Sequence, residues 1–74
     1  MEETIVISDT FITLGQALKE AAVIDSGGQA KWFLSEVPVW VNGEEEQRRG
    51  RKLYPGDRVT IDEIGAINIA NHDE

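Results

Sequence analysis

The dipeptide Asn42-Gly43 is the feature that most restricts the fold of this chain. It lies between the extended stretch 39–41, Val-Trp-Val, and the residues 44–47. An Asn-Gly pair between two extended stretches is the strongest short hairpin signal, because a type I′ turn needs positive φ at both central residues. We therefore predict an antiparallel hairpin whose second strand is an exposed edge, since consecutive glutamates are poor strand formers.

Two helices are predicted before this hairpin. Thr13 and Gln16 have the capping-box spacing, and apolar residues follow at helical period: Leu14, Ala17, Leu18, Ala21 and Ala22. Ser26 and Gln29 repeat the capping-box spacing, and a second apolar stripe follows it: Ala30, Phe33, Leu34 and Val37. Pro38 ends the second helix. Lys31 and Trp32 fall outside the second stripe, so both are expected on the surface.

Further strands are predicted at 4–8, 58–62 and 66–70, with a type II-like turn at 54–57. Ile5 and Ile7 should share one face of the first strand and Val6 the other. No repeat or linker divides the chain. We predict one α+β domain over 1–74, in the order β-α-α-β-β-β, with a helix pair packed on a small, mostly antiparallel, twisted sheet.

The chemistry of the side chains argues against an enzyme. The chain of 74 residues has no cysteine, and its one histidine, His72, lies in a polar tail. No nucleophile, P-loop or zinc motif occurs. The run Glu44-Glu45-Glu46 is expected to be a solvated edge rather than a metal site, because successive strand residues point to opposite faces. We expect no catalytic residue, metal or cofactor.

The start of the sequence is acidic and has a short apolar run, unlike a signal peptide, and no run approaches about 18 apolar residues. The expected location is the cytoplasm.

Charge is distributed unevenly along the chain. The formal net charge is −7. All seven cations lie between Thr10 and Ile61, where seven anions balance them, so the acidic surplus lies at the two ends. Four cations gather after the hairpin: Arg48, Arg49, Arg51 and Lys52. Screening falls off over roughly 8 Å at physiological ionic strength, so acidic ends on another face need not cancel this cluster.

The cations and glycines together favour a phosphate binder. Gly27-Gly28 precedes a helix, whose N-terminus offers unpaired N–H groups, and Lys31 follows one turn later. Guanidinium groups match phosphate with a planar fork of donors. Taken singly, these features fit a simple cap and a solvated face equally well. Trp32 and Trp40 fit either base stacking or packing.

The motifs S-G-G-Q-A-K, V-W-V-N-G, R-R-G-R-K and P-G-D occur in this order within residues 11–61. Their combination resembles the S-four domain, the RNA-binding domain named after ribosomal small-subunit protein four. The chain is most similar to the small stand-alone bacterial members of the YaaA and YbcJ type. The resemblance implies the alpha-L motif, a helix pair followed by a hairpin, with 11–61 as the core of the domain between acidic termini.

The resemblance implies a non-catalytic protein that binds ribosomal or another structured RNA, with no small-molecule substrate or membrane partner. The RNA surface would consist of Ser26, Gln29, Lys31, Asn42, Arg48, Arg49, Arg51 and Lys52. Trp32 and Trp40 are the candidates for base stacking. The alternative is a protein-interaction adaptor that uses the acidic termini and the exposed tryptophans.

Overall fold

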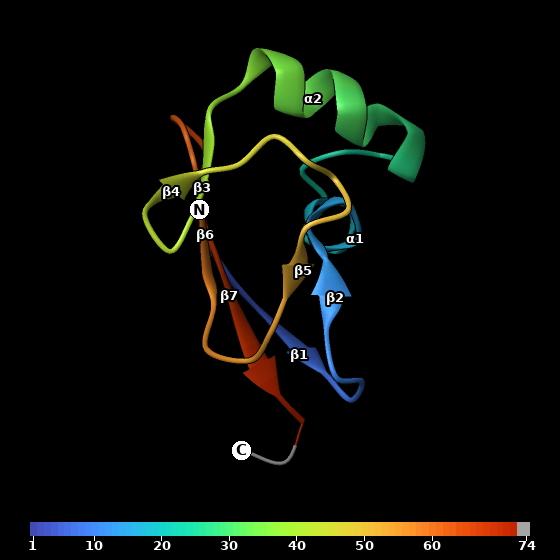
Figure 1. Ribbon diagram of the computed structural model, residues 1–74, viewed down its shortest axis with the longest axis vertical. Coiled ribbons are helices and arrows are strands. Elements are labelled where there is room, and N and C mark those ends of the chain that lie inside the picture. Colours follow the sequence, from blue (N-terminus) through green and yellow to red (C-terminus); the bar gives the residue numbers. More distant parts are fainter. Residues whose placement is uncertain (73–74) are drawn as a thin grey trace.

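A computed structural model describes residues 1–72, so Asp73 and Glu74, counted above with the acidic ends, lie outside the described residues. The helices are α1 (Leu14–Glu20), the 3₁₀ helix η1 (Gly27–Gln29) and α2 (Ala30–Glu36) (Figure 1). The strands are β1 (Glu2–Ile7), β2 (Ile12–Thr13), β3 (Val39–Val41), β4 (Glu44–Glu45), β5 (Lys52–Leu53), β6 (Arg58–Ile61) and β7 (Gly65–Asn71). The predicted α+β class is confirmed.

Five strands form one sheet in the order β1-β7-β6-β3-β4. Its neighbouring pairs are antiparallel except β1 and β7, which run parallel with Glu2 beside Ala66 and Ile7 beside Asn71. The last predicted strand is therefore longer than 66–70 and lies inside the sheet, between β1 and β6. A second, two-stranded sheet joins β2 to β5, neither of which was predicted.

The capping box at the start of α1 is confirmed. Thr13 Oγ1 accepts a hydrogen bond from the Gln16 backbone N–H at 3.3 Å, and Gln16 Oε1 accepts from the Thr13 N–H at 3.2 Å. The helix is shorter than its apolar pattern suggests. Ala21 is the C-cap and Ala22 has φ of 59°, which takes the chain out of the helix. The prediction that the apolar stripe of this helix extends to Ala22 is wrong, because Ala22 lies beyond the helix and its side chain is exposed.

The prediction of a second capping box, at Ser26 and Gln29, is wrong. The Ser26 side chain makes no cap hydrogen bond, and Gln29 Oε1 instead accepts from the Asp25 backbone N–H at 2.7 Å. The reason is local: residues 27–29 form a 3₁₀ turn, so the Gln29 amide reaches one residue beyond Ser26. α2 then buries Ala30 and Leu34 and leaves Phe33 partly exposed.

Both predicted turns are confirmed. Asn42 and Gly43 have φ of 52° and 87°, the positive pair that a type I′ turn needs, and β3 pairs antiparallel with β4 beyond them. At the second turn, the Asp57 N–H donates to the Tyr54 carbonyl at 2.9 Å, and Gly56 has φ of 97°.

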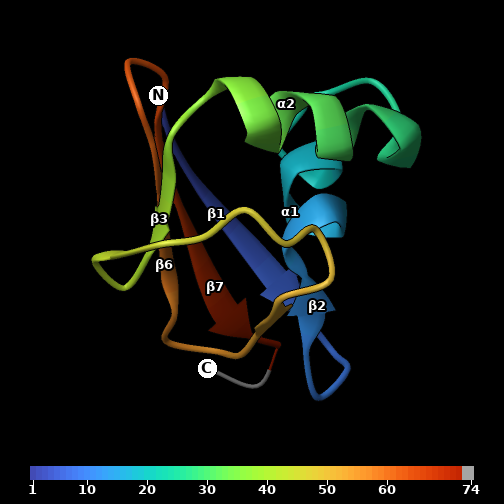
Figure 2. The ribbon, with the colours of Figure 1, turned by 45° about the horizontal axis from the view of Figure 1, so that its top comes forward.

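The core lies between the helices and one face of the five-stranded sheet (Figure 2). Ile5 and Ile7 face it and Val6 faces away with 57% of its surface exposed, as predicted. The largest fully buried side chains are Leu14, Leu18, Leu53, Ile61, Ile67, Val39, Val41 and Val59. The opposite, outer face of the sheet carries polar side chains, including the Arg58 pairs with Glu2 at 2.7 Å and with Asn68 at 2.8 Å.

Candidate nucleic-acid interface

Residues 46–52, here called the basic arm, run from the hairpin across the start of α1 to β5 (Figures 1 and 2, yellow to gold). Two backbone hydrogen bonds fix the arm to the first turn of α1. The Leu14 N–H donates to the Arg51 carbonyl at 2.8 Å, and the Gly15 N–H donates to the Arg49 carbonyl at 2.9 Å. The first N–H groups of a helix have no intrahelical partner. The arm supplies these partners, so its cations are carried on an anchored segment.

Gly15 lets three segments meet. A Cβ at this position would lie 3.4 Å from the Ala30 Cβ and 3.4 Å from the Arg49 Cβ. By intrinsic propensity alone, a glycine within a helix is unfavourable. The structure gives it a packing role, because α1 contacts both α2 and the basic arm there.

The prediction that residues 44–46 form a solvated edge is wrong for Glu46. Glu44 and Glu45 are exposed, but Glu46 has only 7% of its surface exposed. Its Oε2 accepts from the Arg48 backbone N–H at 3.1 Å and from Arg48 Nε at 3.0 Å. Its Oε1 accepts from Arg48 Nη2 at 3.2 Å and from Arg51 Nη1 at 2.8 Å. One buried carboxylate therefore holds two of the four clustered cations.

The surroundings of Glu46 lower the pKa of its carboxyl to about 2, and the largest cause is the side-chain hydrogen bond from Arg48. The Arg51 side chain and the Arg48 backbone N–H act in the same direction, whereas burial opposes them. The carboxylate is therefore charged at neutral pH. This role of Glu46 was not predicted from the sequence, although its spacing from Arg48 and Arg51 was the available signal.

The other cations of the interface differ in their contacts. Arg49 is exposed, and its side chain has no hydrogen-bond or ion-pair partner among residues 1–72; the same is true of Lys31 on α2. Lys52 Nζ lies 4.9 Å from the centre of the Phe11 ring, which packs 6.1 Å from the Tyr54 ring. Arg49 and Lys31 are thus the cations most available to a ligand.

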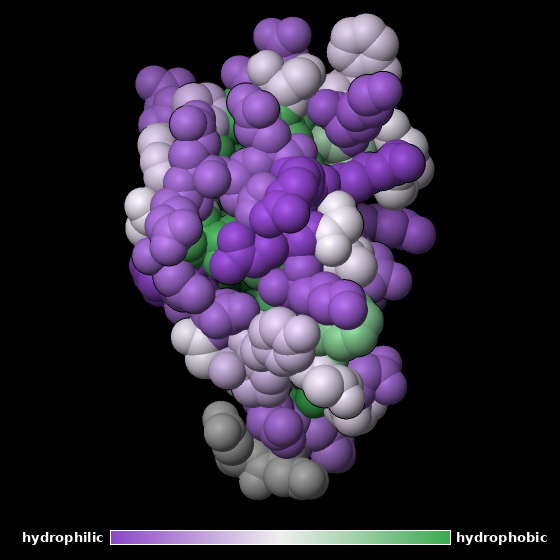
Figure 3. Space-filling model, in the orientation of Figure 1, coloured by the Kyte–Doolittle hydropathy of each residue, from purple (hydrophilic) through white to green (hydrophobic). Residues whose placement is uncertain are grey.

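An open hollow of about 350 Å³ brings the glycine segment and the arm together. It is lined by residues of α1 and its cap, of η1 and of the arm: Thr13, Gly15, Gln16, Gly27, Arg49 and Gly50. In both ribbon views the arm passes close to the start of α1. Strongly hydrophilic side chains cover this face of the molecule (Figure 3).

The remaining predicted site residues have other surroundings. Ser26 is exposed beside η1. The amide of Asn42 is bonded within the protein, since Nδ2 donates to Asp57 Oδ1 at 3.0 Å and Oδ1 accepts from the Arg58 N–H at 2.9 Å. Trp32 has 74% of its surface exposed on α2. Trp40 is partly buried on the outer face of the sheet, opposite Thr60, so the two tryptophans do not form one patch.

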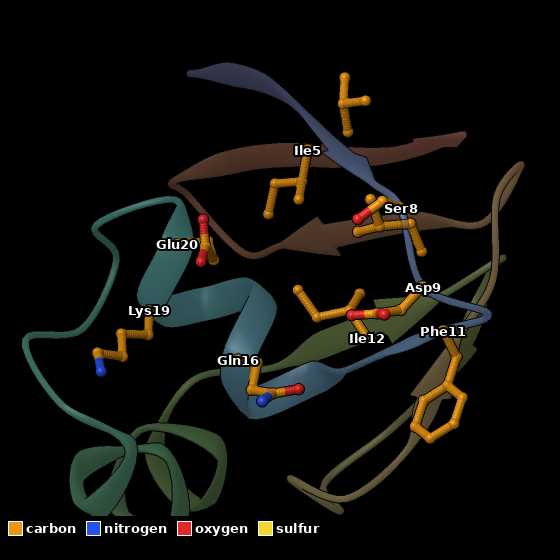
Figure 4. A pocket seen from close by; sticks show the side chains of 10 residues that line it. Ile5, Ser8, Asp9, Phe11, Ile12, Gln16, Lys19 and Glu20 are labelled. Carbon is orange, nitrogen blue, oxygen red and sulfur yellow. The ribbon is translucent and has the colours of Figure 1, made fainter. Parts of the chain in front are cut away.

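A larger hollow, about 550 Å³, does not adjoin the basic arm. It lies between β1 and α1, with Gln16 and Glu20 on α1 and Asp9 and Phe11 on the segment that joins β1 to β2 (Figure 4). Its lining has no histidine and no paired nucleophile and base. Among residues 1–72, no group of three or more histidine or acidic side chains could hold a metal ion. We therefore assign the candidate site to the basic arm.

Within the described part of the chain, no helix has the length and apolar character needed to cross a membrane.

The chain belongs to the S4 domain family, whose profile matches residues 5–70. The match includes the second half of β1 and most of β7, and both strands contribute to the hydrophobic core. The predicted resemblance is confirmed.

Two curated relatives are similar to this chain. One is the Probable ribosome maturation protein RlbA of Bacillus subtilis, which is 56% identical over 71 residues, 96% of this chain and 100% of the relative. The other is the Small ribosomal subunit protein uS4m of Schizosaccharomyces pombe, which is 34% identical over 58 residues, 78% of this chain and 18% of the relative. No solved structure matches at a significant level.

Proposed function

We propose that this chain is a non-catalytic RNA-binding protein that recognises ribosomal or another structured RNA through the basic arm and the start of η1 and α2. The observation that carries the proposal is the position of Arg49. Its side chain is free and exposed, and it lines one hollow with Gly27 at the start of η1. Backbone phosphates supply most of the affinity of such complexes, and arginine is suited to binding them.

The family and the relatives support the same proposal. An S4 domain and two relatives named for the ribosome or its maturation point to a role connected with RNA. We place this role in the cytoplasm, at or near ribosomal particles, with RNA rather than a small molecule or a membrane as the partner. Ser26, Gln29, Lys31 and the arm cations remain the proposed contacts, with Trp32 as a stacking surface.

The adaptor alternative would combine the acidic ends with both tryptophans. Glu2, one of the acidic end residues, is paired with Arg58 and bonded to Asn68. Trp40 lines an open hollow with Glu2 and Glu63, whereas Trp32 lies on α2 and does not line it. A single surface built from the acidic ends and both tryptophans is therefore absent from residues 1–72.

Co-sedimentation with bacterial ribosomal subunits tests the proposal. We expect association that nuclease treatment abolishes, whereas association that resists nuclease would indicate a protein partner instead. Arg49→Ala should weaken binding to purified ribosomal RNA. Arg58→Ala removes the same charge from the outer face of the sheet and should not. Equal affinities for the two variants would contradict the proposed site.

Salt dependence provides a second measurement. With around five phosphate contacts, the logarithm of the association constant should fall with the logarithm of salt concentration at a slope of about −3 to −5. A slope near zero would exclude a phosphate-binding surface.

A further inference from the structure

Glu46 is the only buried charged side chain in the part of the chain that the structure describes. It belongs to the basic arm, a segment proposed to bind a polyanion. Its carboxylate accepts hydrogen bonds from Arg48 and Arg51, which flank Arg49 on both sides. An acid among phosphate-binding cations needs an explanation, because by charge alone it repels the ligand.

We infer that Glu46 is a positioning residue that strengthens RNA binding by fixing Arg48 and Arg51 in place. The inference rests on the proposed function, and it assigns an anion a favourable part in the recognition of a polyanion.

Preorganisation is the physical basis. A free arginine side chain loses rotamer freedom when it binds, and this loss reduces affinity. Glu46 restricts both side chains before the ligand arrives. Arg48 remains exposed over 76% of its side chain and Arg51 over 32%, so both can still meet a ligand. The carboxylate contacts use Nε and Nη2 of Arg48 and Nη1 of Arg51, which leaves Arg48 Nη1 and Arg51 Nη2 for phosphate.

The arm keeps its positive charge despite the acid. Residues 46–52 contain one anion and four cations, a net charge of +3. The backbone bond from the Arg48 N–H also shapes the chain where it enters the turn 48–51, which the Arg51 N–H closes on the Arg48 carbonyl at 3.1 Å. Glu46 therefore orders the backbone that carries Arg49 as well as the two arginines that it contacts.

The test uses two variants with the same change in charge. Glu46→Gln and Glu45→Gln each remove one carboxylate, but Glu45 is exposed on β4. If charge alone mattered, both would bind purified ribosomal RNA slightly more tightly. We expect Glu45→Gln to be unchanged or up to about twofold tighter, and Glu46→Gln to be about three- to tenfold weaker.

A second measurement is the slope of the logarithm of the association constant against the logarithm of salt concentration. A residue that only stabilised the fold would not change this slope. In folded Glu46→Gln, loosened Arg48 and Arg51 should give a shallower slope than wild type, by about one to two units. Circular dichroism shows whether the variant is folded at the assay temperature. If it is not, Glu46→Asp keeps the net charge while shortening the reach of the carboxylate, and we expect it to bind at least about threefold more weakly than Glu45→Asp.

The outcomes separate the two claims. Wild-type protein that binds no ribosomal RNA would overturn the proposed function and, with it, this inference. RNA binding that depends on Arg49 but is equal or tighter in both Glu46→Gln and Glu46→Asp would overturn the inference alone.

Discussion

At the scale of a single residue, the hydrogen bonds to the Glu46 carboxylate keep it charged over a wider range of pH. Its folded-state pKa of about 2 lies below the ordinary value of 4.5. Because the folded pKa is lowered, the carboxylate stabilises the fold above about pH 5. This contribution is lost as pH falls from the ordinary pKa through the folded one.

At pH 6 we expect the wild-type protein to have a free energy of unfolding about 2 kcal/mol larger than that of the Glu46→Gln variant. This difference should shrink towards zero near pH 2. This value is less than the full pKa shift implies, because solvent screens the exposed Arg48. Urea unfolding of the wild type and the variant at several pH values measures this difference in free energy. The other acidic groups are the same in both proteins, so their contributions cancel. A difference that stays constant with pH would contradict this assignment.

Asn42 shows how one side chain serves two structural purposes. It has positive φ, and its amide joins the hairpin to the turn 54–57 through Asp57 and to the start of β6 through Arg58. Asn42→Gly removes the amide bonds but keeps the preference for positive φ. Asn42→Ala loses both. We expect both variants to be less stable than wild type, and Asn42→Ala to be less stable than Asn42→Gly by about 1 kcal/mol. Chemical denaturation of the three proteins gives the comparison, and equal stability of the two variants would show that backbone conformation is not limiting.

At the scale of elements, the site depends on how α1, α2 and the basic arm meet at Gly15. An alanine there fits at ordinary contact distance and improves helix propensity, so Gly15→Ala should change stability by less than about 1 kcal/mol. A leucine has no such room, and Gly15→Leu should destabilise the fold by about 1–3 kcal/mol because Ala30 and the arm must move. Thermal unfolding distinguishes the two variants. Similar stability for Gly15→Leu and Gly15→Ala would show that the three segments are not tightly packed.

Trp32 is the exposed aromatic of α2. If an RNA base stacks on it, Trp32→Ala should weaken RNA binding by about 1–3 kcal/mol. The fold should remain as stable as before, because 74% of the residue is exposed. The Trp40→Phe protein leaves Trp32 as the single tryptophan, so its fluorescence should be quenched on RNA addition. Unchanged fluorescence and unchanged affinity would exclude stacking at this position.

Local signals in the sequence predicted those parts of the fold that depend on near neighbours. The capping box of α1, the Asn42-Gly43 hairpin and the turn 54–57 all follow from a few adjacent residues. The place of β7 inside the sheet, beside β1, depends on contacts between the two ends of the chain. Short-range patterns carry no information about such contacts.

The candidate site could be predicted in part. The clustered cations and the exposure of Trp32 are visible in the sequence, because charge and helical period are local properties. The burial of Glu46 was not predicted, since it depends on the path of the arm, which leaves β3 after the Glu46 N–H bonds to the Val39 carbonyl and then folds over α1. The contact of Gly15 with Arg49 depends on the same path of the arm.

On the scale of the whole molecule, the net charge of −7 and a basic arm coexist because the charges occupy different places. Four of the seven cations occupy the anchored arm over α1. The acidic residue Glu2 lies on the outer face of the sheet, where Arg58 compensates it. Charges that lie more than roughly 8 Å apart interact only weakly at physiological salt. The affinity for RNA should therefore depend on one face rather than on the sum of charges.

The most direct test of whether RNA binds the basic arm and the start of η1 and α2 is hydrogen exchange measured by mass spectrometry, with and without purified ribosomal RNA. We expect RNA to slow exchange in residues 26–31 and 47–52 and to leave β6 and the outer face around Trp40 unchanged. Protection centred on Trp40 and β6, with none in the arm, would contradict the account.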